Sequence, residues 1–398
     1  MQTLSITTTP SNLLMIIFPL IIIFPSIIQS LQIPLLKTSL FDGIYTSINN
    51  DQLSTIIKID MKSQHTFIYS STFINIGTKV DNTTHNISLP FKPYYLQSSL
   101  LTTSISLPAK DGSSYFIDNI YLYYYDNAND AGHYLQNLFP LAPTYQDDNF
   151  SLIHKMYLNK LITEESFGIV FAMNNSVNSQ LYIDEIPSDI MNYYTHKCKI
   201  KNNSNKWNCD LNKVIVSDPI NNKHELYYDN YDFAYFDSSS KFILAPQEFI
   251  TFLKKEVLKE FIRKQECIVD GFYNIRQIEC VCDVVLKDDF YFEVSFVFQG
   301  IKLKIKKELL FERYGKTCGM LIEVNTFNKT EWVIGEPLFR EYFMKFNINE
   351  QSIMFYSKNN LSVSPIRNIN VIFKLYRFII ILLISTCIFN LFVYIKKF

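Results

Sequence analysis

The sequence predicts a mainly β protein with a few short helices, arranged as two lobes between two terminal apolar segments. Three observations lead to this prediction. Short runs rich in Ile, Val, Phe and Tyr recur along the chain with polar turns between them, as in sandwiches and barrels. Only two stretches have the apolar spacing of a helix. The 398 residues, 48% of them hydrophobic, are sufficient for two domains or lobes.

Composition also narrows the function. The chain has 37 Lys and Arg against 38 Asp and Glu, a net charge of −1, and no basic block. Nucleic acid is therefore not an expected partner, because phosphate contacts need clustered Lys and Arg. Aromatic residues make up 15% of the chain, which excludes wholesale disorder.

The N-terminal apolar run covers residues 13–28 (LLMIIFPLIIIFPSII) and is followed by a small residue, Ser30. It predicts a secretory signal peptide over residues 1–30, although the usual positive charge is missing. The alternative is an uncleaved anchor helix. Pro19 and Pro25 argue against that alternative, because proline disrupts a helix interior.

The C-terminal apolar run, residues 378–395, is just long enough to cross a bilayer as a helix. It predicts a membrane span after a juxtamembrane linker (361–377), with a cytosolic tail at 396–398 that holds two lysines. The alternative is the removed tail of a lipid-anchor signal. We expect a single-pass protein of the secretory pathway or cell surface, with a lumenal or extracellular body.

Residues between these segments fit an exported body. Glycosylation sequons occur at Asn82, Asn86, Asn149, Asn174, Asn202, Asn328 and Asn360. Six cysteines lie in the body and the seventh, Cys387, lies in the C-terminal apolar run, which is consistent with three disulfides. A zinc site is the alternative, but the cysteine spacing is wrong for paired CxxC knuckles and the six histidines are scattered. We expect neither a metal nor a cofactor.

The predicted strands include 55–60 (TIIKID), 65–70, 115–125, 290–298 and 301–305. The predicted helices are 149–160 (NFSLIHKMYLNK) and 246–264 (PQEFITFLKKEVLKEFIRK), the second opening with proline at an early position. The body therefore has about one helix in each half.

Two stretches near the C-terminus carry a family resemblance. Residues 332–343 (WVIGEPLFREYF) resemble the pattern W-I-[IL]-G-x-x-[FL]-[LI]-R-x-[YF] of pepsin-like aspartic proteases. Residues 234–246 (AYFDSSSKFILAP) resemble the second active-site loop of that family, D-[TS]-G-[TS]-S. The resemblance places Asp237 at the second catalytic Asp, with Ser239 replacing a glycine. It also implies that Gly335 lets a buried loop pass close to the catalytic carboxylate.

The resemblance extends over about residues 45–357 and implies a bilobal pepsin-like fold, with lobes at 31–175 and 176–360. Residues 57–64 (IKIDMKSQ) are similar to the first-lobe turn I-x-I-G-x-P-x-Q, and 138–143 (LFPLAP) to D-G-I-[LI]-G-L-[AG], both without their glycines. Residues 150–171 resemble the helix and strand that close the first lobe, and residues 179–187 resemble the linker strand S-x-L-x-[IF]-G-G-[IV]. Cys282 and Cys318 match the second-lobe disulfide of the family, and proximity suggests Cys198–Cys209 and Cys267–Cys280 as the other pairs.

Aspartic proteolysis needs two carboxyl groups on one water molecule, an ionised one to take its proton and a protonated one to polarise the scissile carbonyl. The resemblance puts the first-lobe position at Tyr69, Ser70 or Ser71, none of which is an acid. Asp60 aligns with a glycine of the upstream turn and is the weaker candidate. Tyr95 is the best match to the tyrosine of the flap that covers the substrate, with an ordinary core or surface tyrosine as the alternative.

These residues predict an exported, membrane-anchored member of the family that no longer cleaves peptides. Its interlobe cleft would bind a peptide or protein ligand, or the chain would serve as a surface protein in which the fold is only a scaffold. The alternative is an active aspartic endopeptidase with an unusual acid pair that uses Asp237.

Overall fold

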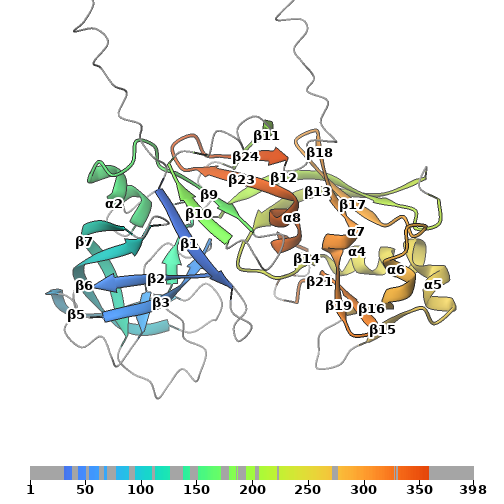
Figure 1. The fold of residues 1–398 in the computed structure, drawn as a ribbon, viewed down its shortest axis with the longest axis horizontal. Helices are drawn as coiled ribbons and strands as arrows, with labels where there is room; N and C mark the ends of the chain where they lie inside the picture. The colour runs from blue at the N-terminus through green and yellow to red at the C-terminus, as the bar shows by residue number, and fades with distance from the viewer. Residues whose placement is uncertain are drawn as a thin grey trace, which may run out of the picture.

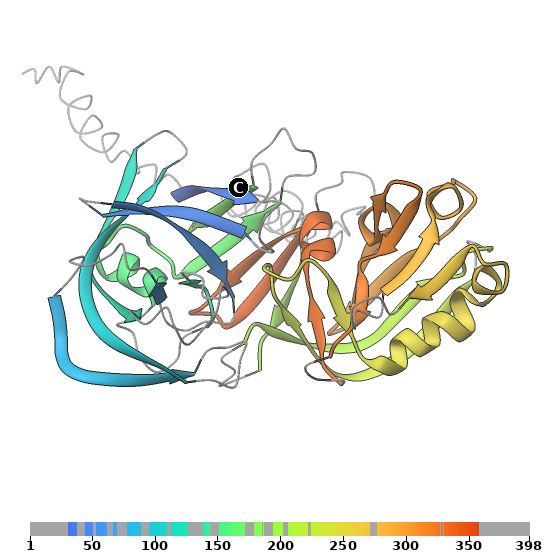
Figure 2. The same ribbon diagram turned by 90° about the horizontal axis from the view of Figure 1, so that it is seen from below.

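The structure is a computed structural model (Figures 1 and 2). It describes residues 31–37, 44–50, 53–61, 67–69, 78–88, 95–109, 113–125, 138–143, 151–171, 179–184, 186, 194–201, 206–221, 224–270, 277–326, 328 and 330–357.

The N-terminal half is a curved sheet of mostly antiparallel strands with a helix against it (Figure 1). Its elements are β1 (Leu31–Lys37), β2 (Ile44–Asn50), β3 (Leu53–Asp60), β4 (Phe67–Tyr69), β5 (Thr78–Ser88), β6 (Tyr95–Pro108), β7 (Ser114–Tyr125), β8 (Leu138–Pro140), α2 (Leu152–Leu158), β9 (Ser166–Val170) and β10 (Ser179–Ile183). Helix α2 begins after Ser151, whose side chain accepts a hydrogen bond from the His154 N–H group and so caps the helix.

The C-terminal half has a second large sheet and a small four-stranded one. Its first elements are β11 (Tyr194–Lys199), β12 (Asn208–Ser217), β13 (Glu225–Phe236), β14 (Ile243–Ala245), α4 (Gln247–Phe252), η4 (Leu253–Val257), α5 (Lys259–Arg263), β15 (Cys267–Asp270), β16 (Gln277–Val281) and α6 (Cys282–Val285). The remaining elements are β17 (Glu293–Phe298), β18 (Ile301–Lys306), α7 (Lys307–Leu310), β19 (Phe311–Tyr314), β20 (Thr317–Met320), β21 (Ile322–Val324), β22 (Trp332–Ile334), α8 (Glu336–Glu341), β23 (Tyr342–Asn347) and β24 (Ser352–Ser357).

One sheet joins the halves. Strand β23 pairs antiparallel with β9 of the N-terminal half, with Phe346 opposite Phe167, and the order β11-β24-β23-β9-β10-β1 continues across the junction. In Figure 2 the red-orange strands of the C-terminal half lie between the two bodies. The halves therefore share a hydrogen-bonded base and are not merely linked by a flexible connection.

The predicted strands and helices are largely confirmed. The runs at 55–60, 65–70, 115–125, 290–298 and 301–305 correspond to β3, β4, β7, β17 and β18. The predicted helix at 149–160 is α2, and the one at 246–264 is the succession α4, η4 and α5, which contains a π-helical turn. The apolar side of this long helix is buried through Phe249, Ile250 and Leu253.

The largest side chains in the core are aromatic. The largest fully buried ones are Trp207, Trp332, Phe139, Phe167, Phe249, Phe292, Phe296, Phe298, Phe339, Phe343, Phe346 and Phe355. Burying each of these groups stabilises the fold by roughly 1.5–3 kcal/mol or more, so this set is a main source of its stability.

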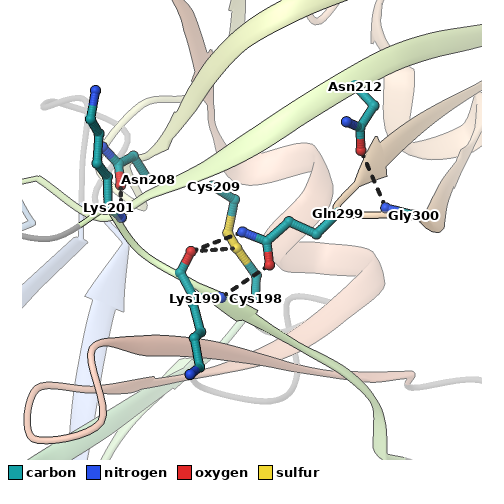
Figure 3. Close-up of a disulfide and its surroundings, with 8 residues drawn as sticks. All are labelled: Cys198, Lys199, Lys201, Asn208, Cys209, Asn212, Gln299 and Gly300. Carbon is teal, nitrogen blue, oxygen red and sulfur yellow. Dashed lines mark hydrogen bonds between the residues drawn. A yellow bond between two sulfur atoms is a disulfide. The ribbon is translucent and has the colours of Figure 1, made fainter.

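The three expected disulfides are confirmed as Cys198–Cys209, Cys267–Cys280 and Cys282–Cys318. The first bonds β11 of the shared sheet to the start of β12 (Figure 3). Beside it, Gln299 accepts a hydrogen bond from the Lys199 N–H group (3.3 Å) and donates one to the Lys199 carbonyl (3.0 Å). The end of β11 is thus held both to the start of β12 and to the turn between β17 and β18.

Both terminal apolar segments, residues 1–30 and 378–395, lie outside the described residues, as do the linker 361–377 and the tail 396–398. Among the residues that are described, no helix is both long enough and apolar enough to span a bilayer.

Candidate active site

Asp237 directly follows β13, at a point where the chain leaves the sheet. Its N–H group donates to the Ile334 carbonyl of β22 (3.0 Å), and its side chain is 2% exposed. Ser239 donates two hydrogen bonds to Asp237 Oδ1, one from its N–H group (3.0 Å) and one from its hydroxyl (2.6 Å). The carboxyl group is therefore held in one orientation by the residue that replaces the family's glycine.

Gly335 provides the space for the loop after Asp237. A Cβ atom added to Gly335 would lie 2.1 Å from the Phe242 carbonyl oxygen and 2.5 Å from that of Ser240. The Ser240 carbonyl also accepts a hydrogen bond from the Glu336 N–H group (2.8 Å). The close approach expected at Gly335 is confirmed, since only a residue without a side chain allows it.

The N-terminal half repeats this arrangement of strands. In the N-terminal half, β8 pairs parallel with β3 and antiparallel with β4. In the C-terminal half, β22 pairs in the same way, parallel with β13 and antiparallel with β14. The parallel pair Ile59 and Phe139 corresponds to Phe236 and Ile334. The two halves can therefore be compared residue by residue.

This register makes Asp60 the counterpart of Asp237. The antiparallel pair is Phe67 and Leu138 in the N-terminal half, and Leu244 and Val333 in the C-terminal half. Phe67 lies seven residues after Asp60, and Leu244 lies seven residues after Asp237 (60 to 67 and 237 to 244). Asp60, with 0% exposure, thus ends its strand as Asp237 does.

The two strand ends also touch. The Ser238 N–H group donates to the sulfur of Met61 at 3.3 Å, although the two residues are 177 apart in sequence. Met61 follows Asp60, and Ser238 follows Asp237. The structure therefore brings two acidic residues, one from each half, to a single junction between the halves.

Comparison with known proteins is decisive for the family. The family model described as eukaryotic aspartyl protease matches residues 139–358, more than half of the chain.

The chain belongs to the eukaryotic aspartyl protease family.

Solved structures agree with this membership at the level of the fold. Basic 7S globulin from soybean superposes with a TM-score of 0.62 at 10% identity, covering 83% of this chain and 97% of the globulin. Conglutin gamma, a basic 7S globulin from lupine seeds, gives 0.66 at 9% identity, covering 83% and 95%. No curated protein matches the sequence. At such identities the likeness concerns the fold alone.

For this aspartyl protease family member, the strand register does not support the expected first-lobe position. Tyr69 ends β4, nine residues beyond Asp60, and pairs with Tyr125 of β7. By register it corresponds to Pro246 and not to Asp237. Ser70 and Ser71 lie outside the described residues. By strand register, the residue of the N-terminal half that corresponds to Asp237 is therefore Asp60, which is an acid.

The difference between the expected and the observed position comes from the turn before β3. The resemblance of residues 57–64 to the family's first turn predicts that Asp60 lies upstream of the site. In the structure that turn lies earlier, because Asn50 pairs with Leu53 where β2 turns into β3. The missed signal is the similarity of IDMKS (59–63) to FDSSS (236–240). The Asp of each segment lies seven and six residues, respectively, before the first residue of the next strand.

The Asp60 end departs from the Asp237 end in its neighbours. Pro140 corresponds to Gly335 by register and carries a ring where Gly335 has only hydrogen. Met61 presents a thioether where Ser238 presents a hydroxyl. Each strand end carries an Asp, but Pro140 does not leave the space that Gly335 leaves for a close backbone approach.

The other expected sites are less informative. Tyr95 is the first residue of β6 and pairs with Ser88, which leaves its flap role untested. Among the sequons, Asn82 and Asn86 lie in β5, Asn328 is exposed, and Asn149, Asn174, Asn202 and Asn360 lie outside the described residues. In the part of the chain that the structure describes, no three His, Cys, Asp or Glu side chains gather where a metal ion could bind.

Proposed function

We propose that this chain is an aspartic-type endopeptidase whose acid pair is Asp60 and Asp237. The observation that carries the proposal is the matched register of the two strand ends, together with the contact between Met61 and Ser238. Two carboxyl groups on one water molecule are what aspartic proteolysis requires. With Asp60 as the second acid, the active endopeptidase that the sequence offers as an alternative has a complete acid pair.

The two acids have different roles in the proposed mechanism. Hydrogen bonds donated to a carboxylate suit its ionised form, and Ser239 donates two to Asp237. We therefore assign Asp237 as the base that takes a proton from the attacking water. Asp60 would be the protonated partner that donates a hydrogen bond to the scissile carbonyl oxygen, since two adjacent carboxyl groups favour sharing one proton.

A second candidate function is a cleft that binds peptides without cleaving them. The specific observations in its favour are Pro140 and Met61, which change the surroundings of Asp60, and the near-complete burial of both acids (0% and 2% exposed). Burial of both acids limits the access of a water molecule to them, which would disfavour hydrolysis. In this candidate the acid pair would be a structural remnant.

The cellular setting is also a proposal. The three disulfides support an oxidising compartment, because such bonds persist in secreted and lumenal proteins. Export by the segment 1–30 and anchoring by 378–395 remain proposals based on sequence. Digestion of membranes with added protease, with and without detergent, would test on which side the body lies.

The testing experiment is cleavage of a denatured protein between pH 3 and 6. Wild-type chain is compared with Asp60→Asn, Asp237→Asn and the control Asp210→Asn, whose acid is exposed on β12. The peptidase proposal expects cleavage by the wild type and the control, and a loss of at least about 10²-fold in each active-site variant. Peptide binding by the wild type without cleavage would favour the second candidate instead.

A further inference from the structure

A continuous path of hydrogen bonds connects the two acid-bearing strand ends. The Leu141 N–H group donates to the Asp60 carbonyl (2.8 Å), and the Leu141 carbonyl accepts from the indole N–H group of Trp207 (2.6 Å). The Trp207 carbonyl in turn accepts from the N–H group of Phe236 (2.8 Å), the residue before Asp237. Trp207 is thus the member of this path that crosses from one half to the other.

Packing holds the Trp207 side chain in one place. It is 1% exposed, and its ring contacts Phe167 of β9 and Phe346 of β23 edge-on, with centroids 5.6 and 5.1 Å away. Those two phenylalanines stack on each other at 5.0 Å. The indole therefore sits among rings of both halves, at the sheet they share.

The backbone of Trp207 is fixed as well. Cys209, two residues later, is bonded to Cys198, and the neighbouring Asn208 side chain accepts a hydrogen bond from the Lys201 N–H group (3.1 Å; Figure 3). Because the indole N–H group can donate a hydrogen bond but not accept one, Trp207 is the donor and the Leu141 carbonyl is the acceptor.

We propose that Trp207 is a positioning residue that sets how the Asp60 end lies relative to the Asp237 end. Its catalytic consequence rests on the proposed peptidase function, but its structural consequence does not. The competing explanation is that Trp207 only fills space in the core, in which case its N–H group has no particular effect on the opposite half.

The two explanations differ for Trp207→Phe, which keeps an aromatic ring but removes the donor. The matched control is Trp332→Phe. Trp332 is also fully buried, and it packs against Phe249 and Phe296 within the C-terminal half (centroids 4.8 and 5.4 Å). Both variants lose a similar volume, and only the first loses the bond to Leu141.

The decisive measurement is amide hydrogen exchange in the peptide covering 138–143, which lies in the opposite half. We expect exchange there to become at least about tenfold faster in Trp207→Phe and to stay unchanged in Trp332→Phe, because the bond to the Leu141 carbonyl is lost. Equal exchange in the two variants would overturn the proposal.

Wild-type protein gives a second test should Trp207→Phe fail to fold. The chain has two tryptophans, so ¹⁵N labelling gives two indole signals. We expect the Trp207 indole proton to lie downfield, as a short hydrogen bond requires, and to exchange only when the molecule unfolds. A Trp207 indole proton that exchanges well before unfolding would contradict the proposal.

Activity separates this inference from the proposed function. If the wild type cleaves, Trp207→Phe should lower kcat on the order of 10²-fold with little change in KM, because a displacement of about 1 Å has that effect. Trp332→Phe should leave kcat near its wild-type value. If the wild type does not cleave, the peptidase proposal fails, while the exchange at 138–143 still decides the role of Trp207.

Discussion

The two strand ends of this molecule have the same topology and different surroundings. The Asp237 end has Gly335 beneath its loop and two donors from Ser239 on its carboxyl group. At the Asp60 end Pro140 takes the place of Gly335, and Met61 takes the place of Ser238. Strand pairing therefore preserves the position of an acid even where the residues that usually surround it have changed.

A second difference lies in the covalent support of the halves. All six body cysteines lie at or beyond position 198, and all three disulfides belong to the C-terminal half. The N-terminal half contains no cysteine and so has no disulfide of its own. We therefore expect the two halves to respond differently to the same kind of change.

The largest effect is expected for Gly335→Ala. The added Cβ would meet backbone carbonyls at 2.1 and 2.5 Å, which no rotamer change relieves, so we expect a loss of at least about 3 kcal/mol in unfolding free energy. Pro140→Ala, at the matching place in the other half, should cost about 1 kcal/mol or less. Thermal unfolding of both variants measures the contrast.

Gly300→Ala is the control for Gly335→Ala. Gly300 has a φ of +90° but nothing within 4 Å of an added Cβ, so only backbone strain of about 1 kcal/mol is expected. Equal losses in Gly335→Ala and Gly300→Ala would show that the close approach to the Asp237 loop is not what requires glycine at position 335.

Removal of one disulfide should have an effect of similar size. Cys282 and Cys318 are 36 residues apart, and replacing both by serine should lower the unfolding free energy by about 4 kcal/mol. Limited proteolysis should then cut the C-terminal half first, because the loss lies there. Earlier cutting within the N-terminal half would contradict the separate response of the halves.

A smaller effect is expected for Met61→Leu. Leucine keeps the volume but cannot accept the hydrogen bond from the Ser238 N–H group, so we expect a loss of about 1 kcal/mol. Met344→Leu, at a buried methionine of β23, is the control and should cost less. Chemical denaturation of both proteins measures the difference, and equal midpoints would refute a role for the thioether contact.

The smallest effect at neutral pH concerns Tyr342. Burial raises the pKa of its phenol to about 12, although the Lys304 N–H group donates to its oxygen (2.9 Å) and works in the opposite direction. The unfolded chain ionises first, near pH 10, so this group's contribution is complete below pH 10 and is lost as the pH rises toward 12.

Tyr342→Phe should remove this part of the pH dependence. The wild type should lose about 2–3 kcal/mol more than the variant between pH 10 and 12, as the shift of about two pKa units requires. Denaturation midpoints at several pH values give the comparison. Parallel curves for the two proteins would show that the phenol is not held neutral in the folded state.

Much of the fold could be predicted from the sequence because it depends on local patterns. Alternating apolar residues marked β17 and β18, the amphipathic run marked the helices at 247–263, and the WVIG motif marked Gly335 and the strand before it. Asp237 is recognisable because its loop, residues 237–240 (DSSS), keeps most of the family's motif. These features need no knowledge of distant contacts.

Asp60 and its surroundings were harder to predict. The first-lobe motif lacks its glycines, so similarity of sequence alone predicts a position nine or more residues beyond Asp60, whereas the strand register points to Asp60 itself. The contacts between the halves, such as Ser238 to Met61 and Trp207 to Leu141, join residues 177 and 66 apart. No local pattern specifies such pairs, since they depend on how the two sheets meet.

The central claim, that Asp60 and Asp237 act as a pair, is tested most directly by NMR titration of ¹³C-labelled aspartate carboxyl groups. Two carboxyl groups that share one proton titrate together in two steps. We predict that the Asp237 signal of the wild type follows both steps and that Asp60→Asn reduces them to a single step. An Asp237 titration that is identical in the wild type and in Asp60→Asn would contradict the account.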